Sequence, residues 1–254
     1  MNPNSQLNHI LLISDLHLDT TRPELLQAFF TFVATIAIRA KALYILGDFF
    51  NVWLGDDDDT DLHREISQAL LQLSQQGTAV YFIHGNRDFL LGQKFASACG
   101  ASLIYEPYEL EYLGKHYLLL HGDVLCTGDT DYIQFRTLVR NPQWQQEFLQ
   151  RSLAERREFA AQARTISKNM NSNKAEDIMD ANQDAVVSLL LSYPRATLIH
   201  GHTHRPAVHE FNLAQTRKQR IVLGDWDAYG WYVQLNADGA QQTRFNLQTG
   251  QPVP

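Results

Sequence analysis

The sequence contains little cysteine and no long apolar segment. Only Cys99 and Cys126 occur in 254 residues, which excludes a disulfide framework and a cysteine-based zinc site, so we expect both thiols to be reduced and structural. No run approaches the roughly 18 uncharged apolar residues that a membrane-spanning helix needs. The first ten residues lack the basic start and the apolar stretch of a signal peptide. These absences predict a cytoplasmic protein.

A basic excess is also absent. The net charge of −7 argues against a general nucleic-acid-binding protein, and we expect no nucleic-acid partner. The charge is unevenly distributed, however. Residues 132–174 hold eight basic and three acidic side chains, a net charge of +5, so the rest of the chain carries −12. The composition is otherwise typical of a globular protein with a large core, at 44% hydrophobic and 19% charged residues.

Short apolar strands alternate with helices in the first third of the chain. Strands are predicted at residues 9–14, 42–47 and 79–84, because consecutive aliphatic residues are typical of strands whose two faces are both covered. Helices are predicted between and after them, at residues 23–40, 60–76 and 89–99. This alternation predicts right-handed crossovers and a mostly parallel sheet.

The pattern changes after Gly100. A hairpin with a two-residue turn at Gly114-Lys115 is predicted from residues 109–113 and 116–120. Strands return near the end, at residues 196–199, 207–211, 220–223, 231–235 and 242–245. The sequence therefore predicts an α/β core, formed by residues 1–130 and 183–254 with two sheets packed face to face. A polar helical cap at residues 131–182 interrupts it.

Five short segments share one position, because each directly follows an apolar strand. Ligands in open α/β sheets bind beyond the carboxyl ends of the strands, so these segments should converge in space. Each supplies a carboxylate, amide or imidazole donor that suits borderline divalent ions such as manganese, zinc or iron. The segments are Asp15-Leu16-His17, Gly47-Asp48, Gly85-Asn86-Arg87-Asp88, His121-Gly122-Asp123 and Gly201-His202-Thr203-His204.

The spacing within these segments also suits metal binding. Asp15 and His17 would face the same way if the strand continued, so both could reach one ion. Glycine before Asp48, Asn86 and His202 permits a tight turn and a close approach to an ion. The carboxylate of Asp48 can bridge two metals about 4 Å apart. A single histidine after a strand is more often structural than a ligand, but five such segments in one chain are a specific signal.

In this order the five motifs resemble those of the calcineurin-like metallophosphoesterase family, over residues 10–235. The resemblance implies a four-layer αββα fold with a dinuclear metal site. One ion would be bound by Asp15, His17, Asp48 and His204. The other would be bound by Asp48, Asn86, His121 and His202. We expect Asp88 and Asp123 to contact the metal ligands, or the turns that carry them, and so to fix their orientation.

Arg87 occupies a position where many members of this family have a histidine that protonates an alkoxide leaving group. Arginine cannot donate its proton usefully, but it can clamp a phosphate through two hydrogen bonds. A phosphate-monoester leaving group, whose second pKa is about 6, needs little protonation at pH 7. Arg87 therefore favours cleavage of a phosphoanhydride over an ordinary phosphodiester.

Longer stretches resemble the branch of the family that hydrolyses UDP-2,3-diacylglucosamine in the lipid A pathway. They are residues 14–18 (SDLHL), 47–57 (GDFFNVWLGDD), 84–90 (HGNRDFL), 121–123 (HGD), 200–206 (HGHTHRP) and 222–226 (VLGDW), together with the helical cap. The resemblance implies attack at the α-phosphorus, giving 2,3-diacylglucosamine 1-phosphate and UMP, usually with two manganese ions. Asn86, Arg87 and His202 would stabilise the phosphoryl oxygens, and head-group contacts would come from Asp129, Ser167, Asn171 and Lys174.

The cap also has an apolar side. Two compatible interpretations are packing on the core and a groove for two acyl chains. With the basic charge of the cap, the second favours a monomer bound peripherally to the cytoplasmic face of the inner membrane. The residues of this side are Tyr132, Phe135, Leu138, Val139, Trp144, Phe148, Leu149, Leu153 and Phe159.

Two alternatives stay open. A different dinuclear phosphoesterase on the same core could act on dinucleoside polyphosphates or phosphodiesters, and a cap without an apolar groove would favour it. A catalytically inactive scaffold would lack a metal ligand, but none is missing. Residues 56–59 are interpreted as a solvated loop, and His200 lies near the site at the buried end of a strand without an assigned role.

Overall fold

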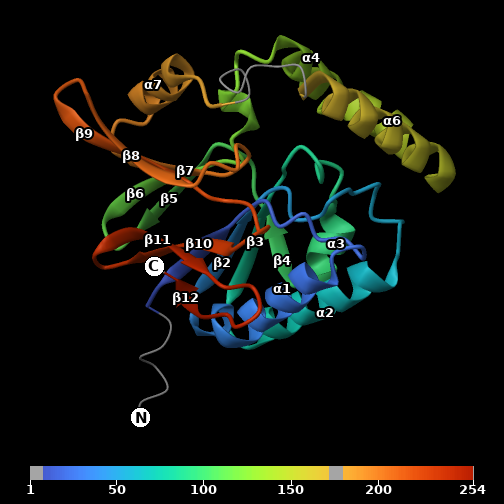
Figure 1. Ribbon diagram of the computed structural model, residues 1–254, viewed down its shortest axis with the longest axis horizontal. Helices are drawn as coiled ribbons and strands as arrows, with labels where there is room; N and C mark the ends of the chain where they lie inside the picture. The colour runs from blue at the N-terminus through green and yellow to red at the C-terminus, as the bar shows by residue number, and fades with distance from the viewer. Residues whose placement is uncertain (1–7, 172–179, 254) are drawn as a thin grey trace.

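Two β-sheets form the centre of the protein in the computed structural model, which describes residues 8–171 and 180–253 (Figure 1). In spatial order the first sheet contains β12 (Pro252–Val253), β11 (Gly239–Phe245), β10 (Gly230–Asn236), β1 (Ile10–Ile13), β2 (Ala42–Leu46), β3 (Ala79–Ile83) and β4 (Ala101–Leu103). The second contains β5 (Tyr108–Tyr112), β6 (Lys115–Leu119), β7 (Ala196–His200), β9 (Thr216–Val222) and β8 (Ala207–Leu213).

Both sheets are mixed, which corrects the prediction of a mostly parallel sheet. Strands β1 to β4 run parallel, as do β6, β7 and β9. The remaining strands add antiparallel at the edges, because they follow one another through hairpins such as β8–β9 and β10–β11. The parallel strands form the part of each sheet that carries the predicted site.

Alternate residues of β1 enter two different cores, which explains its uninterrupted apolar sequence. Leu11 and Ile13 pack in the cluster that contains the helices α1 (Pro23–Thr35) and α2 (Asp61–Gln75). Ile10 and Leu12 pack between the two sheets, against residues of β6, β7 and β9. Each fully buried aliphatic side chain of this kind stabilises the fold by roughly 1.5–3 kcal/mol.

A fourth layer covers the other face of the five-stranded sheet. The helix α7 (Gln183–Ser192) packs Val186 and Leu190 against Leu118 and Leu198 of that sheet. The layers are therefore helices, sheet, sheet and helix, so the predicted αββα architecture is confirmed. Helix α7 and the short edge strands β4 and β12 were not predicted from the sequence.

Two helices differ from their predicted bounds. The first predicted helix breaks after α1 and continues as a 3-10 helix, η2 (Ala37–Arg39). The third, α3 (Gln93–Ala98), begins four residues later than predicted. The carboxylate of Asp56 accepts hydrogen bonds from the backbone N–H groups of Gly92 and Phe95, at 2.8 and 2.9 Å, and thereby fixes the helix start from a distant loop.

The hairpin turn lies one residue earlier than predicted. Tyr112 pairs with Lys115, so Leu113 and Gly114 form the turn. Their φ angles are 49° and 74°, and a type I′ turn requires positive φ at both central positions.

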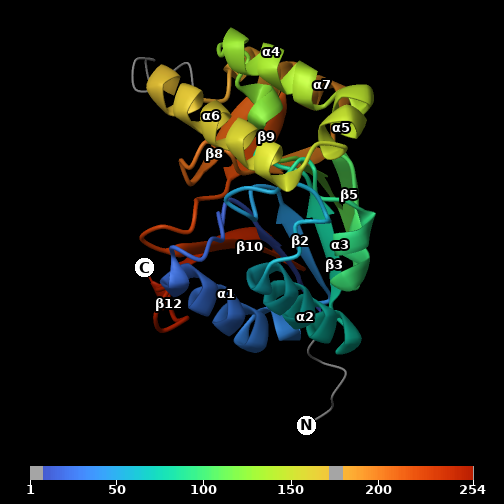
Figure 2. The same ribbon diagram turned by 90° about the vertical axis from the view of Figure 1, so that its right-hand side faces the viewer.

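The helical insertion lies over the carboxyl ends of the parallel strands, opposite α1 and α2 (Figure 2). It contains α4 (Thr130–Val139), α5 (Pro142–Leu149) and α6 (Leu153–Asn171). Trp144, Phe148 and Phe159 pack together, with ring centroids 4.7–5.6 Å apart, and Trp144 lies 6.4 Å from Phe89 of the core. Part of the predicted apolar side therefore anchors the cap to the core.

Residues 56–59 correct a further interpretation, since this loop is not merely solvated. Asp57 binds the guanidinium of Arg156 on α6, whose side chain is only 2% exposed. Asp58 binds the neighbouring Arg157 at 2.5 Å. The acidic loop therefore docks the cap onto the core.

Two further expectations concern the cysteines and membrane-spanning helices. Cys99 and Cys126 are both buried, and neither forms a disulfide within the described residues, as predicted. Among the residues that the structure describes, none of the helices has the length and apolar character needed to cross a membrane.

Candidate active site

The five predicted segments converge above the two sheets. The seven-stranded sheet contributes the loops after β1, β2 and β3, and the five-stranded sheet contributes those after β6 and β7. Backbone hydrogen bonds join the loops to one another, from Asp15 N–H to the Gly47 carbonyl at 3.1 Å and from Gly201 N–H to the His121 carbonyl at 2.8 Å. The site is therefore built jointly by strands that are far apart in the sequence.

Five of the seven predicted ligands have a left-handed backbone. Their φ angles are 56° at Asp15, 50° at His17, 48° at Asp48, 68° at His202 and 54° at His204. This conformation costs a non-glycine residue about 1–3 kcal/mol and persists where the surroundings enforce it, often at functional sites. Because β1 ends at Ile13, the strand does not continue through Asp15 and His17, and turns instead aim both side chains at the same cluster.

The glycines of these segments permit close approach, as predicted. A Cβ on Gly85 would lie 2.1 Å from the backbone nitrogen of Asp48, and one on Gly201 would lie 2.1 Å from Oδ2 of Asp15. Both distances are far below van der Waals contact, so any larger residue would push the ligand loops apart.

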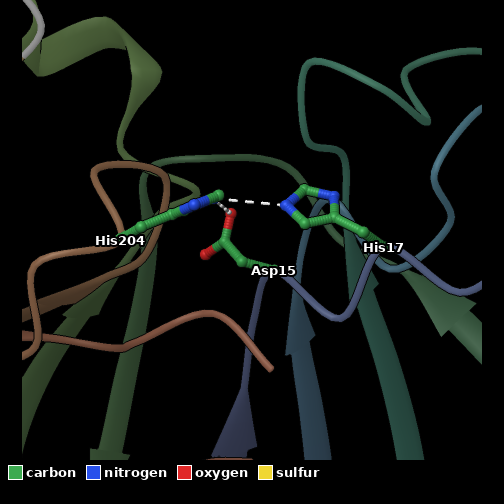
Figure 3. Close-up of side chains that lie close together, drawn as sticks. All are labelled: Asp15, His17 and His204. Carbon is green, nitrogen blue, oxygen red and sulfur yellow. Dashed lines mark hydrogen bonds and ion pairs between the residues drawn. The ribbon is translucent and has the colours of Figure 1, made fainter. Parts of the chain in front are cut away.

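Asp15, His17 and His204 point toward one another and form the first cluster (Figure 3). Nε2 of His204 lies 3.3 Å from Oδ1 of Asp15 and 3.2 Å from Nε2 of His17. Asp15 is completely buried. Its Oδ1 and the Nδ1 of His17 are buried atoms that make no hydrogen bond with any described residue. Buried nitrogen and oxygen atoms without a hydrogen bond fit a metal ion.

Asn86, His121 and His202 form the second cluster. The side-chain oxygen of Asn86 lies 2.8 Å from Nε2 of His121 and 2.8 Å from Nδ1 of His202. The Leu46 carbonyl lies 2.9 Å from Nδ1 of His121, so Nδ1 donates to it and Nε2 is the ring nitrogen that faces the cluster.

Asp48 lies between the two clusters. Its Oδ2 is 3.9 Å from Nδ1 of His17, and its Oδ1 is 3.7 Å from Nε2 of His121. Asp15, Asp48 and His121 also place ligand atoms within 4.8 Å of one another. One carboxylate that faces both clusters fits the geometry of a bridging ligand.

The electrostatics of the site favour an added cation. Burial lowers the pKa of His121, but the charges of Asp48 and Asp15 outweigh it and raise this pKa to about 9. Burial and the charges of Asp88 and Asp15 raise the pKa of Asp48 to about 7. Asp48 and His121 therefore hold protons near neutral pH unless another cation, such as a metal ion, replaces them.

The imidazoles of His17 and His202 are ready to act as ligands. Burial lowers the pKa of His17 to about 3 and that of His202 to about 4, so both rings are neutral at pH 7. A neutral ring offers a lone pair to a metal. The seven residues thus fit a pair of divalent ions in donor type, charge and proximity, and their individual assignment as ligands stays a prediction.

Asp88 orients turns, as predicted. Its carboxylate accepts hydrogen bonds from the backbone N–H groups of Gly85 and Phe49, each at 2.7 Å. It therefore ties the loop after β2 to the loop after β3, and so fixes Asp48 relative to Asn86.

Asp225 is a site residue that the analysis of the sequence missed. Its Oδ2 lies 3.4 Å from Nδ1 of His204, on the side of the ring away from Asp15. A carboxylate behind a metal-binding histidine fixes the ring and increases its basicity. The signal was present, because Gly224-Asp225 follows β9 just as Gly47-Asp48 follows β2.

Arg164 of the cap is a second missed residue. Its Nη2 donates to the side-chain oxygen of Asn51 at 2.8 Å, and Nη1 of Arg87 donates to the same oxygen at 3.1 Å. Burial and the charge of Arg87 lower the pKa of Arg164. Two guanidinium groups that share one neutral acceptor beside Asp48 form a site suited to a phosphate anion.

His200 is buried beneath the site. Its Nδ1 donates to the Gly201 carbonyl at 2.9 Å, and burial lowers its pKa to about 3. The ring fills the space against Gly122, where an added Cβ would lie 2.7 Å from Nδ1. Its role in this geometry is packing.

The predicted head-group contacts stay predictions. Asp129 is buried and caps α4 by accepting from Tyr132 N–H at 3.1 Å, while Ser167 is exposed on α6. The side chain of Asn171 and all of Lys174 lie outside the described residues.

The family of the chain follows from comparison with known proteins. The model of the calcineurin-like phosphoesterase family matches residues 9–206. The chain belongs to this family, as the five motifs indicated.

Comparison with curated proteins shows which members of this family the chain is similar to. The UDP-2,3-diacylglucosamine hydrolase of Hahella chejuensis is 49% identical over 231 residues, which cover 91% of this chain and 95% of that protein. The protein of the same name from Cellvibrio japonicus is 49% identical over 229 residues, covering 90% and 95%. That of Yersinia pestis is 47% identical over 235 residues, covering 92% and 98%. Because these matches span nearly the whole of each chain, they extend through the helical insertion as well as the core.

Proposed function

We propose that this chain hydrolyses the pyrophosphate bond of UDP-2,3-diacylglucosamine by attack at the α-phosphorus. The products are 2,3-diacylglucosamine 1-phosphate and UMP, as in lipid A biosynthesis. One observation carries the proposal. The two clusters of metal-binding side chains lie beside two guanidinium groups, that of Arg87 from the core and that of Arg164 from the helical cap. The named function of the curated relatives, which match the chain almost end to end, supports the choice of substrate.

Two manganese ions are the proposed cofactors. Asp15, His17, Asp48 and His204 would hold one, and Asp48, Asn86, His121 and His202 the other. Carboxylate, amide and imidazole donors suit manganese among other divalent ions. Bound divalent ions lower the pKa of water and neutralise phosphoryl charge.

The polar residues of the site bind and orient the diphosphate. Arg87 and Arg164 offer guanidinium N–H groups on both sides of Asn51, one from the core and one from the cap. Asn86 directs its oxygen at His121 and His202, which leaves its NH₂ group to donate to a phosphoryl oxygen. A general acid is not required, because the sugar 1-phosphate is a stable leaving group near neutral pH.

An apolar groove beside Arg164 is the proposed site of the acyl chains. It has a volume of about 320 Å³ and is lined by Val52, Leu54, Arg157, Ala160, Ala161 and Arg164. It opens next to the Arg87–Asn51–Arg164 cluster, so a diphosphate held there would place its lipid along α6.

An activity assay tests the proposal. Chelated protein should be inactive, and manganese should restore hydrolysis of UDP-2,3-diacylglucosamine to UMP. A simple phosphodiester and a dinucleoside polyphosphate serve as comparison substrates. Faster cleavage of either would favour the alternative, a phosphoesterase of different specificity on the same core.

Arg87→Ala tests whether Arg87 selects a phosphoanhydride over a simple phosphodiester. Because Arg87 clamps a phosphate and donates no proton, the variant should lose phosphoanhydride hydrolysis and keep its activity on the simple diester. The opposite pattern would show that Arg87 does not select the phosphoanhydride.

Peripheral binding of a monomer to the inner membrane on its cytoplasmic side is part of the proposal. It is supported by the net charge of +5 on residues 132–174. Arg156 is buried and holds the cap in place, so Arg151, which is exposed, is the better residue for charge reversal. Arg151→Glu should reduce flotation with anionic liposomes, whereas Arg217→Glu, in the distant β8–β9 hairpin, should not. Equal flotation of all three proteins would count against membrane contact through the cap.

A further inference from the structure

One face of α4 contacts the loops of the second cluster. Tyr132, Arg136 and Arg140 are spaced four residues apart, so they lie on the same side of the helix. All three side chains are directed at the core, although α4 belongs to the cap by its position in the sequence.

The first two residues brace the loop of His121. Oη of Tyr132 and Nε of Arg136 both donate to Oδ2 of Asp123, at 2.5 and 2.7 Å. Nη2 of Arg136 also donates to Oε1 of Glu106 at 2.7 Å, and Oε2 of Glu106 accepts from the backbone N–H of His121 at 2.8 Å. Arg136 thus joins the carboxylate two residues after His121 to the carboxylate that holds the His121 backbone.

The other contacts reach the two remaining members of the second cluster. Nη2 of Arg140 donates to the Gly85 carbonyl at 2.9 Å, immediately before Asn86. The ring of Tyr132 lies against the ring of His202, with centroids 5.9 Å apart. One helix face therefore supports Asn86, His121 and His202 together.

The first cluster is supported differently. His204 makes ion pairs with Asp15 and with Asp225, and the backbone N–H of His17 donates to the Asp48 carbonyl. These partners belong to the core, although Arg205, next to His204, also pairs with Asp180 near the end of the cap. The two clusters therefore differ in which part of the chain holds their ligands in place.

We propose that α4 is a positioning element for the second metal ion, so that this helix sets the affinity of one metal and not that of the other. Arg136 is its central residue, and Tyr132 and Arg140 extend it to His202 and Asn86. The inference rests on the dinuclear site of the proposed function. It gives the cap a role in assembling the reaction centre in addition to covering the substrate.

Calorimetric titration of the chelated protein with manganese chloride tests this role without any substrate. The wild-type protein should bind two ions. Arg136→Gln should weaken one of the two sites by about 10- to 100-fold, the effect typical of losing an outer partner of a metal ligand, and leave the other unchanged. Arg151→Gln removes the same charge from an exposed position of the cap and should leave both affinities unchanged.

A second variant distinguishes a specific effect on the metal site from misfolding. Tyr132→Phe keeps the ring against His202 and removes only the hydrogen bond to Asp123, so it should weaken the same site by a smaller factor. Circular dichroism should be unchanged in both variants. Equal weakening of both sites, or no change in either site of Arg136→Gln, would overturn the proposal. A wild-type protein that binds fewer than two ions would refute the dinuclear site, whereas two ions without hydrolysis would refute only the proposed substrate.

Discussion

Replacing Arg156 should loosen the cap, because this single buried guanidinium joins α6 to the acidic loop of the core. Arg156 is 2% exposed. Its Nη1 donates to the Leu54 carbonyl at 2.6 Å and to Asp57 Oδ1 at 2.8 Å, and its Nη2 donates to Asp57 Oδ2. Arg156→Ala removes these bonds together and leaves the buried Leu54 carbonyl without its partner.

The free energy lost in Arg156→Ala depends on how exposed the partners of Arg156 are. An unsatisfied buried carbonyl costs about 1–3 kcal/mol, and a hydrogen bond to a charged group contributes about 1.5–3 kcal/mol. The side chain of Asp57 is 57% exposed, so water replaces most of the arginine's contribution to that carboxylate. We therefore expect a loss of about 2–3 kcal/mol in the free energy of opening α6, from these two terms after the discount for Asp57.

The neighbouring residue supplies a matched control. Arg157 pairs with the next carboxylate, Asp58, but its side chain is 55% exposed. An exposed ion pair contributes roughly 0–1 kcal/mol, so Arg157→Ala should have little effect.

Hydrogen exchange at equilibrium measures the difference directly. Amides of α6 should exchange about 30- to 150-fold faster in Arg156→Ala than in the wild-type protein, which is the opening free energy converted at 1.4 kcal/mol per tenfold. Amides of α1 and α2 should be unaffected. Equal acceleration in Arg157→Ala, or unchanged exchange of α6 in Arg156→Ala, would refute the reasoning that burial determines the strength of this contact.

Three further predictions concern the metal site and the thiols. The pKa values of Asp48 and His121 are raised to about 7 and about 9, so bound protons stabilise the metal-free fold. The melting temperature of the metal-free protein should therefore fall as the pH rises through these values. Added manganese should abolish that fall. A flat profile with chelator present would contradict this. Asp225→Asn should weaken one manganese site by about tenfold, as seen by calorimetry, because His204 loses its charged partner; unchanged binding would argue against that support. Burial raises the pKa of Cys99 and raises that of Cys126 to about 12, so neither should react with a thiol reagent at pH 8 until the protein is denatured.

The strands and the two sheets packed face to face could be predicted from the sequence pattern, because a run such as residues 10–13 has only one stable environment, whereas the αββα layering was implied by the family resemblance. Four consecutive aliphatic residues in a strand need apolar neighbours on both faces, and the two clusters on either side of β1 supply them. The motifs after the strands were equally predictable, since parallel strands place their carboxyl ends at the same edge of a sheet. Helix α7 was missed because its apolar residues lie close to the start of β7, where a short helix and a loop are difficult to distinguish by periodicity.

The sequence by itself therefore determined which residues could meet and what kind of ion they would suit. Only the tertiary structure decided how they meet. The left-handed turns at Asp15 and His17 are imposed by hydrogen bonds to the loop after β2, and a strand pattern contains no sign of them. The partners of the cap, Asp57 with Arg156 and Asp123 with Arg136, are 99 and 13 residues apart. Such pairs are selected by burial and charge in the folded state, where a buried guanidinium must find an acceptor, and that requirement acts only once distant segments have been brought into contact.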